Sequence, residues 1–209
     1  MGLKCQGIKK SPIWLIGDSD PEKWADKLDD VFDDRHPTFH NIWTPIIYRI
    51  QKKLYKEKNK LIKDERFYIT NAIFDASKKP KGNARSWDSR TIGPGKSKYL
   101  EERLKEIKTL ISNYNPKIVI TFGSFAFEFM RRCEGEKAEA FIHWNTEKLY
   151  EQFSDSIENK KRIIPLLHRS ISMGHFLSCH EKFSDNGNYF EYVSKSLYKR
   201  MVDIMKLIA

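Results

Sequence analysis

The sequence has few cysteines, no long apolar run and no apolar segment near its start that would direct export. Cys5, Cys133 and Cys179 lie far apart, without the spacing of a metal site. An iron–sulfur cluster needs one cysteine more than the chain has, and scattered, unpaired cysteines are typical of a reducing compartment. No apolar run approaches the ~18 residues of a membrane span. We therefore expect a cytoplasmic protein that does not enter a membrane.

Length and composition limit the kind of fold. The 209 residues include 40% hydrophobic residues, which suits a soluble domain with a sizeable core. The chain shows no internal repeat and no low-complexity linker. We expect one domain over residues 1–209 and a monomer.

Positive charge exceeds negative charge by a wide margin. The formal net charge is +10, and a basic surface favours a polyanion because neutralised phosphates release their counterions. The alternative is that a chain rich in Lys, Ile and Asn only reflects the composition of its genome. The charge is uneven, since residues 18–34 are acidic, whereas three segments are basic: 49–63, 78–108 and 160–169.

Apolar runs alternate with segments of helical periodicity. Short apolar runs predict buried strands at about 12–17, 66–70, 117–122 and 162–167. Apolar residues spaced three or four apart predict helices at about 22–33, 42–54, 98–113 and 188–207, and directly after Gly123. The polar segment 75–97 predicts a long loop, and 133–160 an irregular insertion with some helix. This alternation predicts an α/β fold, a three-layer α/β/α sandwich with a central four-stranded parallel sheet.

Every predicted strand ends in a polar residue or a glycine. The strands lead, in chain order, into Gly17-Asp18-Ser19-Asp20-Pro21, Thr70-Asn71, Gly123 and His168-Arg169-Ser170. Parallel sheets bind ligands beyond the carboxyl ends of their strands. We therefore expect an acid, an amide, a glycine turn and a histidine to meet at one site.

These groups suit chemistry on a nucleobase, and each also has a structural explanation. A carboxylate at Asp18 or Asp20 can hold water or stabilise positive charge on a sugar, although Asp before Pro is also common at a helix start. Asn71 offers a donor and an acceptor, which match the edge of uracil or a similar base, but Asn also ends strands in turns. His168 can donate to a developing oxyanion, or it caps the end of a strand.

Further candidates lie in the loops. Phe39 can stack on a base turned out of a duplex, or it closes the core as a lid. Arg169 adds positive charge, and Ser170 can bind a phosphate. The long polar loop carries a basic run that suits a nucleic-acid backbone, although charge runs are commonly only solvated; this run comprises Lys78, Lys79, Lys81, Arg85 and Arg90.

Taken together, the order and spacing of these motifs resemble the uracil-DNA glycosylase superfamily, over about residues 12–205. The likeness is greatest to the thermophile-type branch, in Phe67-Tyr68-Ile69-Thr70-Asn71 and in the stretch from Pro116 to Gly123. The resemblance implies a monofunctional DNA glycosylase that flips out a base and hydrolyses its N-glycosidic bond. It implies double- or single-stranded DNA as the partner, and no metal or other cofactor.

The resemblance also implies roles for single residues. Asn71 and Gly17 form the base pocket, where Phe39 stacks on the base and His168 stabilises its leaving oxygen. The acid is either Asp18, counted from Gly17, or Asp20, counted back from Pro21. The loop after the histidine pushes a side chain into the gap left by the flipped nucleotide; here the apolar candidates are Ile171 and Met173, which otherwise pack in the core.

The chain departs from the family pattern in ways that leave the base open. The first motif has one extra residue, Arg169 replaces a proline, and the iron–sulfur cysteines are absent. Glu22 and Lys23 follow Pro21, so the tyrosine that blocks 5-substituted bases in the uracil-specific branch has no counterpart. Uracil, a deaminated base or a 5-modified pyrimidine fits, in repair or in defence against viral DNA. The alternatives are a non-catalytic DNA- or base-binding module and a nucleoside or nucleotide hydrolase.

Overall fold

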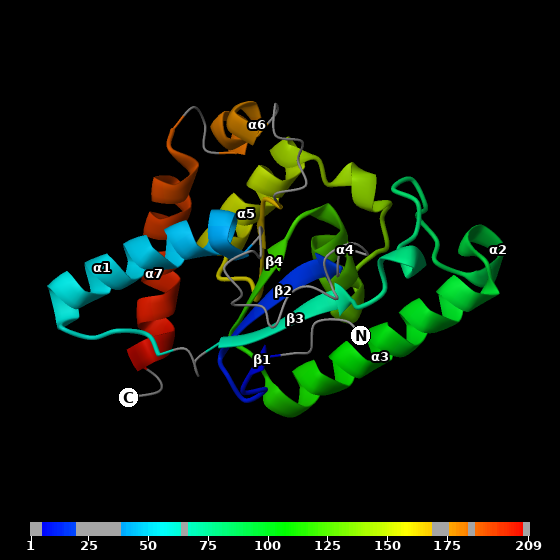
Figure 1. The fold of residues 1–209 in the computed structure, drawn as a ribbon, viewed down its shortest axis with the longest axis horizontal. Coiled ribbons are helices and arrows are strands. Elements are labelled where there is room, and N and C mark those ends of the chain that lie inside the picture. The colour runs from blue at the N-terminus through cyan, green and yellow to red at the C-terminus, as the bar shows by residue number, and fades with distance from the viewer. Residues whose placement is uncertain (1–5, 20–38, 64–66, 169–175, 184–186, 207–209) are drawn as a thin grey trace.

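A five-stranded sheet forms the centre of the protein in the computed structural model (Figure 1). The structure describes residues 6–19, 39–63, 67–168, 176–183 and 187–206. The strands lie in the order β1-β3-β2-β4-β5, with bounds β1 Gln6–Gly7, β2 Ile13–Ser19, β3 Phe67–Ile73, β4 Ile118–Phe122 and β5 Ile163–Leu166. β2 to β5 pair in parallel, which confirms the four predicted strands. A fifth strand, β1, was not predicted, because it pairs antiparallel with β3 over only two residues, too few for an apolar pattern to reveal.

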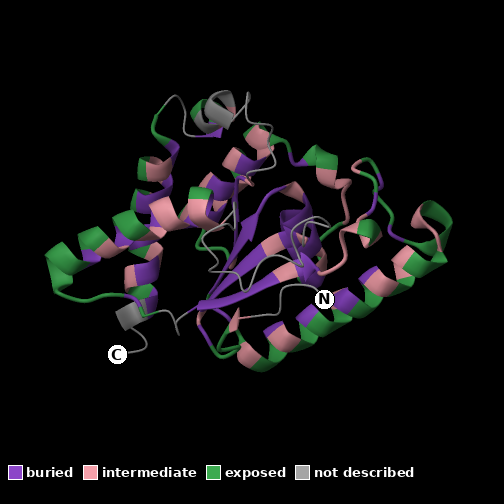
Figure 2. Ribbon diagram, viewed as in Figure 1, coloured by how far each residue is buried: buried purple, intermediate pink, exposed green. Residues whose placement is uncertain are grey.

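Helices cover both faces of the sheet, which confirms the predicted layers (Figures 1 and 2). Trp43, just before α1 (Thr44–Lys58), contacts the rings of Phe67 and Phe122 on one face. On the other face, Arg103 of α3 (Pro94–Tyr114) bonds Thr70 of β3. α4 (Ser124–Cys133) packs beside α3, and α7 (Tyr189–Lys206) packs against α1. No helix in the described ranges is long and apolar enough to cross a membrane.

Most residues of the central strands are buried, as the purple ribbon in Figure 2 shows. All five residues of β4 and all four of β5 are buried. Such strands read as continuous apolar runs because helices cover both of their faces. The polar and glycine positions are therefore confined to the strand ends, and Gly17 and Asn71 are the first residues of β2 and β3 that are not fully buried.

The segment 75–97 is more regular than its composition predicts. It contains the short helix η3 (Ala76–Lys78), the one-turn helix α2 (Ser89–Ile92) and the start of α3 at Pro94. The carboxylates of Asp75 and Asp88 accept hydrogen bonds from backbone N–H groups and cap η3 and α2. A proline suits the first position of a helix, since no N–H is needed there. The prediction of an irregular loop was therefore wrong for these three parts.

Part of the predicted insertion 133–160 is also helical, as η4 (Phe141–His143) and α5 (Thr146–Glu158). A short helix, α6 (Phe176–Phe183), follows β5 and was not among the expected elements. η1 (Phe39–Trp43) precedes α1. The predicted helix at 22–33 lies outside the described residues.

A buried carboxylate ties the insertion to α4. Glu128 has no exposed surface and accepts hydrogen bonds from Arg131, Arg132, the Trp144 indole and the Glu139 backbone, at 2.8 Å each. A buried charge is tolerated when it is paired and its oxygens are satisfied. The segment around residues 139–144 is therefore held against α4.

Candidate active site

Gly17 and Asn71 face each other in register at the carboxyl ends of β2 and β3. A Cβ atom on residue 17 would lie 2.0 Å from Asn71 Oδ1, well inside van der Waals contact. Only glycine at this position therefore lets the Asn71 amide lie across β2. The Asn71 amide therefore lies beside the backbone of Gly17, the residue that precedes Asp18.

A second glycine makes room for His168. Gly123 follows β4 with a φ of +88°, a conformation that glycine adopts without strain. A Cβ atom there would lie 2.7 Å from the Cβ atom of His168, which follows β5. The glycine turn after β4 thus leaves room for the half-buried His168 at the edge of the sheet.

Burial lowers the pKa of His168 below its ordinary value of 6.5. The Asp18 carboxylate opposes this shift and the Lys79 ammonium adds to it, so both charges act on the imidazole. The net shift therefore favours the neutral form of the ring at pH 7. A neutral imidazole can donate a hydrogen bond to an oxygen that gains negative charge.

Asp18 is the acid that the structure places at this edge. Its side chain is 11% exposed, and Oδ2 accepts a hydrogen bond from Lys79 Nζ at 2.6 Å. The other oxygen, Oδ1, is buried, and no described residue donates to it. A buried acceptor without a donor costs free energy, and such atoms in native proteins commonly have a functional reason. Asp20 lies outside the described residues.

Lys79 lies inside the site, a placement that the basic run in the sequence does not reveal. Its ammonium lies 5.0 Å from the ring centroid of Phe125 and 5.2 Å from that of Phe141. These three residues and Asp18 come from four separate parts of the chain. Sequence reasoning grouped Lys79 with its neighbours because nothing local pairs it with an acid 61 residues earlier.

The remaining members of the basic run lie outside this contact. Lys78 ends η3. Lys81 and Arg85 line a pocket of about 480 Å³ together with Lys96, which is not part of the run, and Arg85 also pairs with Glu139 at 2.8 Å. Arg90 lies in α2 and is exposed. The pocket gathers cations close to the segment that carries Lys79, as a phosphate site would.

Phe39 is partly buried and packs against the core, edge-on to His40. It opens η1, whose last residue, Trp43, contacts Phe67 and Phe122. Since side chains alternate along a strand, Asn71 points to the same face as Phe67. The candidate stacking ring therefore belongs to the element that covers this face. Four other predicted contacts lie outside the described residues, namely Arg169, Ser170, Ile171 and Met173.

Arg103 supports the end of β3, a role that sequence reasoning missed. Its guanidinium is 4% exposed and donates to the backbone oxygens of Asn71, at 2.8 Å, and Ala72, at 3.1 Å. It also bonds the Thr70 hydroxyl. The available signal was a charged residue within the apolar stripe of α3, where buried arginines are rare unless paired.

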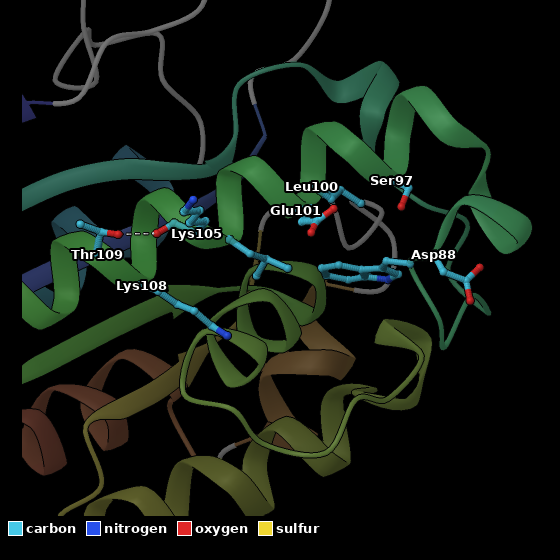
Figure 3. Close-up of a pocket in the computed structure, with 9 residues that line it drawn as sticks. Asp88, Ser97, Leu100, Glu101, Lys105, Lys108 and Thr109 are labelled. Carbon is cyan, nitrogen blue, oxygen red and sulfur yellow. Dashed lines mark hydrogen bonds between the residues drawn. The ribbon is translucent and has the colours of Figure 1, made fainter.

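A larger pocket, of about 580 Å³, lies along α3 beside Trp87 (Figure 3). Leu100 and Leu104 form part of its wall, with Lys105 and Lys108 at the rim. None of the residues that we predict to be catalytic or to bind a base lines it. Pocket volume therefore does not point to the predicted reacting site, which lies instead at the carboxyl ends of the strands.

The fold and these strand ends define a class of α/β protein that presents an acid, an amide and a neutral histidine at one edge of a parallel sheet. The family model of the uracil DNA glycosylase superfamily matches residues 6–197, and the chain belongs to this superfamily. Membership implies, in general, a glycosylase-type hydrolase that acts on DNA. A comparison with curated protein sequences gave no significant match.

We expect Gly17→Ala to displace the Asn71 amide and to lower single-turnover base release roughly 100-fold, because small misplacements at a reacting site cost about this much. The fold should persist, since the new methyl group meets only the end of a side chain. Gly95→Ala is the matched control, because a Cβ atom there has no neighbour within 4 Å. Base release near the wild-type rate in Gly17→Ala would show that Asn71 does not work from this position.

Proposed function

We propose that this protein is a monofunctional DNA glycosylase. It flips a damaged or modified nucleotide out of DNA and hydrolyses the bond between base and sugar, which is inaccessible in the stacked duplex. The observation that carries the proposal is the meeting of Asp18, Asn71 and His168 at the carboxyl edge of the sheet, in a chain of this superfamily.

Base recognition falls to Asn71 and Phe39. The amide offers one donor and one acceptor to the edge of a pyrimidine, while the aromatic ring stacks on its face. Gly17 leaves the space that this amide occupies. Arg103 contributes indirectly, by holding the backbone oxygen of Asn71.

Bond cleavage falls to Asp18 and His168. As the N-glycosidic bond breaks, its electron pair leaves with the base and positive charge grows on the sugar. The Asp18 carboxylate stabilises that charge and accepts a proton from the water whose oxygen attacks C1′. His168 donates a hydrogen bond to the oxygen of the departing base. The base leaves as an anion and takes a proton from solvent, to which Asp18 returns the proton that it accepted. The products are a free base and an abasic site in an uncut strand.

The proposed substrate is a uracil-like, deaminated or 5-modified pyrimidine. Support comes from the residues after Pro21, where Glu22 and Lys23 stand in place of a tyrosine that would block a 5-substituent. A pocket that admits such bases suits the removal of modified bases from foreign DNA as well as repair.

The excision test uses oligonucleotides that carry uracil, hypoxanthine or a 5-modified pyrimidine, scored for alkali-labile sites. We expect the wild type to act on at least one of them. Asn71→Ala and His168→Ala should each slow the single-turnover rate about 100-fold or more, since one oxyanion donor is worth ~3 kcal/mol. Circular dichroism checks that both variants are folded. Rates near wild type in both would remove these residues from the mechanism.

A non-catalytic DNA-binding module is the second candidate. The ion pair between Asp18 and Lys79 favours it, because the lysine already occupies one oxygen of the carboxylate. Tight, salt-sensitive DNA binding without base release from any oligonucleotide, unchanged in Asp18→Ala, would establish this alternative.

The basic pocket should hold DNA phosphates. We expect Lys81→Gln and Lys96→Gln each to weaken binding to all sequences alike and to flatten the plot of log K against log salt by about 0.9. Lys117→Gln is the control, because Lys117 is exposed just before β4, at the opposite edge of the sheet. Equal salt slopes in all three variants and in the wild type would mean that these lysines do not contact the phosphates.

A further inference from the structure

Lys79 is fixed from three directions. Its ammonium bonds Asp18 Oδ2 at 2.6 Å and lies near the faces of Phe125 and Phe141. Its backbone N–H bonds the carbonyl oxygen of Ala76 at 3.1 Å. A lysine that is free to follow a DNA backbone would have none of these constraints, because an ammonium on a long stem is ordinarily well hydrated and mobile.

The two rings are themselves anchored. Phe125 lies in the first turn of α4, and its ring centroid is 5.5 Å from that of Phe141, edge to face. The Trp87 ring packs against Phe125 on another side. Phe141 belongs to the segment that Glu128 holds to α4 through Glu139 and the indole of Trp144. The buried Glu128 carboxylate and the packed rings of Trp87, Phe125 and Phe141 therefore hold the surroundings of the Lys79 ammonium in place.

We infer that Lys79 is a positioning residue for Asp18. Its ammonium bonds Oδ2 and so fixes the orientation of the carboxylate, which receives the proton of the attacking water. This role rests on the proposed function and adds to it a residue that acts through Asp18 and does not touch the substrate.

Two other roles for Lys79 make different predictions. A phosphate contact would act on DNA affinity and its salt dependence, as proposed for the exposed Lys81. A nucleophile would attack C1′ with its own nitrogen, and the resulting imine between Lys79 and the sugar could be trapped by borohydride. Positioning predicts neither effect, because the ammonium stays beside Asp18 and contacts neither a phosphate nor C1′.

The test compares Lys79→Met with Lys117→Met, which removes an equal charge from an exposed position before β4. We expect Lys79→Met to lower the single-turnover rate at saturating protein roughly 100-fold. Its Kd for DNA and the salt slope of binding should match those of the wild type. Lys117→Met should behave as the wild type in all three measurements.

A double-mutant cycle with Asp18→Asn removes the unpaired charge that Lys79→Met alone would leave behind. If Lys79 acts only through Asp18, the double variant should be no slower than Asp18→Asn, to within about twofold. A merely structural role would instead lower thermal stability and leave the saturated rate of the folded fraction unchanged.

Three results would overturn the inference. They are an unchanged saturated rate in Lys79→Met, whether or not DNA binding or thermal stability falls, losses that multiply in the double variant, and a borohydride-trapped adduct that the wild type forms and Lys79→Met does not. If the wild type releases a base, any of these three results overturns only the role of Lys79 and leaves the proposed glycosylase activity standing. A wild type that releases no base from the oligonucleotide set overturns both.

Discussion

Two glycines at the strand ends, Gly17 and Gly123, determine the geometry of the whole site. Neighbouring parallel strands lie only about 4.8 Å apart, so a side chain that reaches across a strand end collides with the next Cβ atom unless that residue is glycine. Gly17 provides this space for the Asn71 amide and Gly123 for His168. The amide and the imidazole therefore reach the edge where β2 presents Asp18. A larger residue at either position would push one of them away from the carboxylate.

The sequence predicted the parts of the site that follow from single strands. Continuous apolar runs marked β2 to β5, and the polar residues after these runs made Asn71, His168 and either Asp18 or Asp20 the candidates for the site. The pairing of Lys79 with Asp18 could not be predicted, because it joins residues 61 apart that no shared periodicity connects. β1 is too short to leave a pattern, and the order of the segment 75–97 depends on side-chain caps that composition conceals.

Charge is arranged differently inside the site and around it. At the strand ends, burial favours the neutral form of His168 and Lys79 offsets the charge of Asp18. Around them the chain is strongly basic, with a net charge of +10, and Lys81, Arg85 and Lys96 share one pocket. Such a division suits a protein that grips the phosphates of DNA with its surface while a nearly neutral pocket admits an uncharged base.

Mass spectrometry of the bases set free from several genomic and phage DNAs tests the central claim most directly, because it needs no prior choice of base. The account predicts one released pyrimidine or deaminated base, an equal number of abasic sites and uncut strands before alkali treatment. Asp18→Asn should release far less of the same base. DNA that is bound tightly but yields no free base from any source would contradict the account.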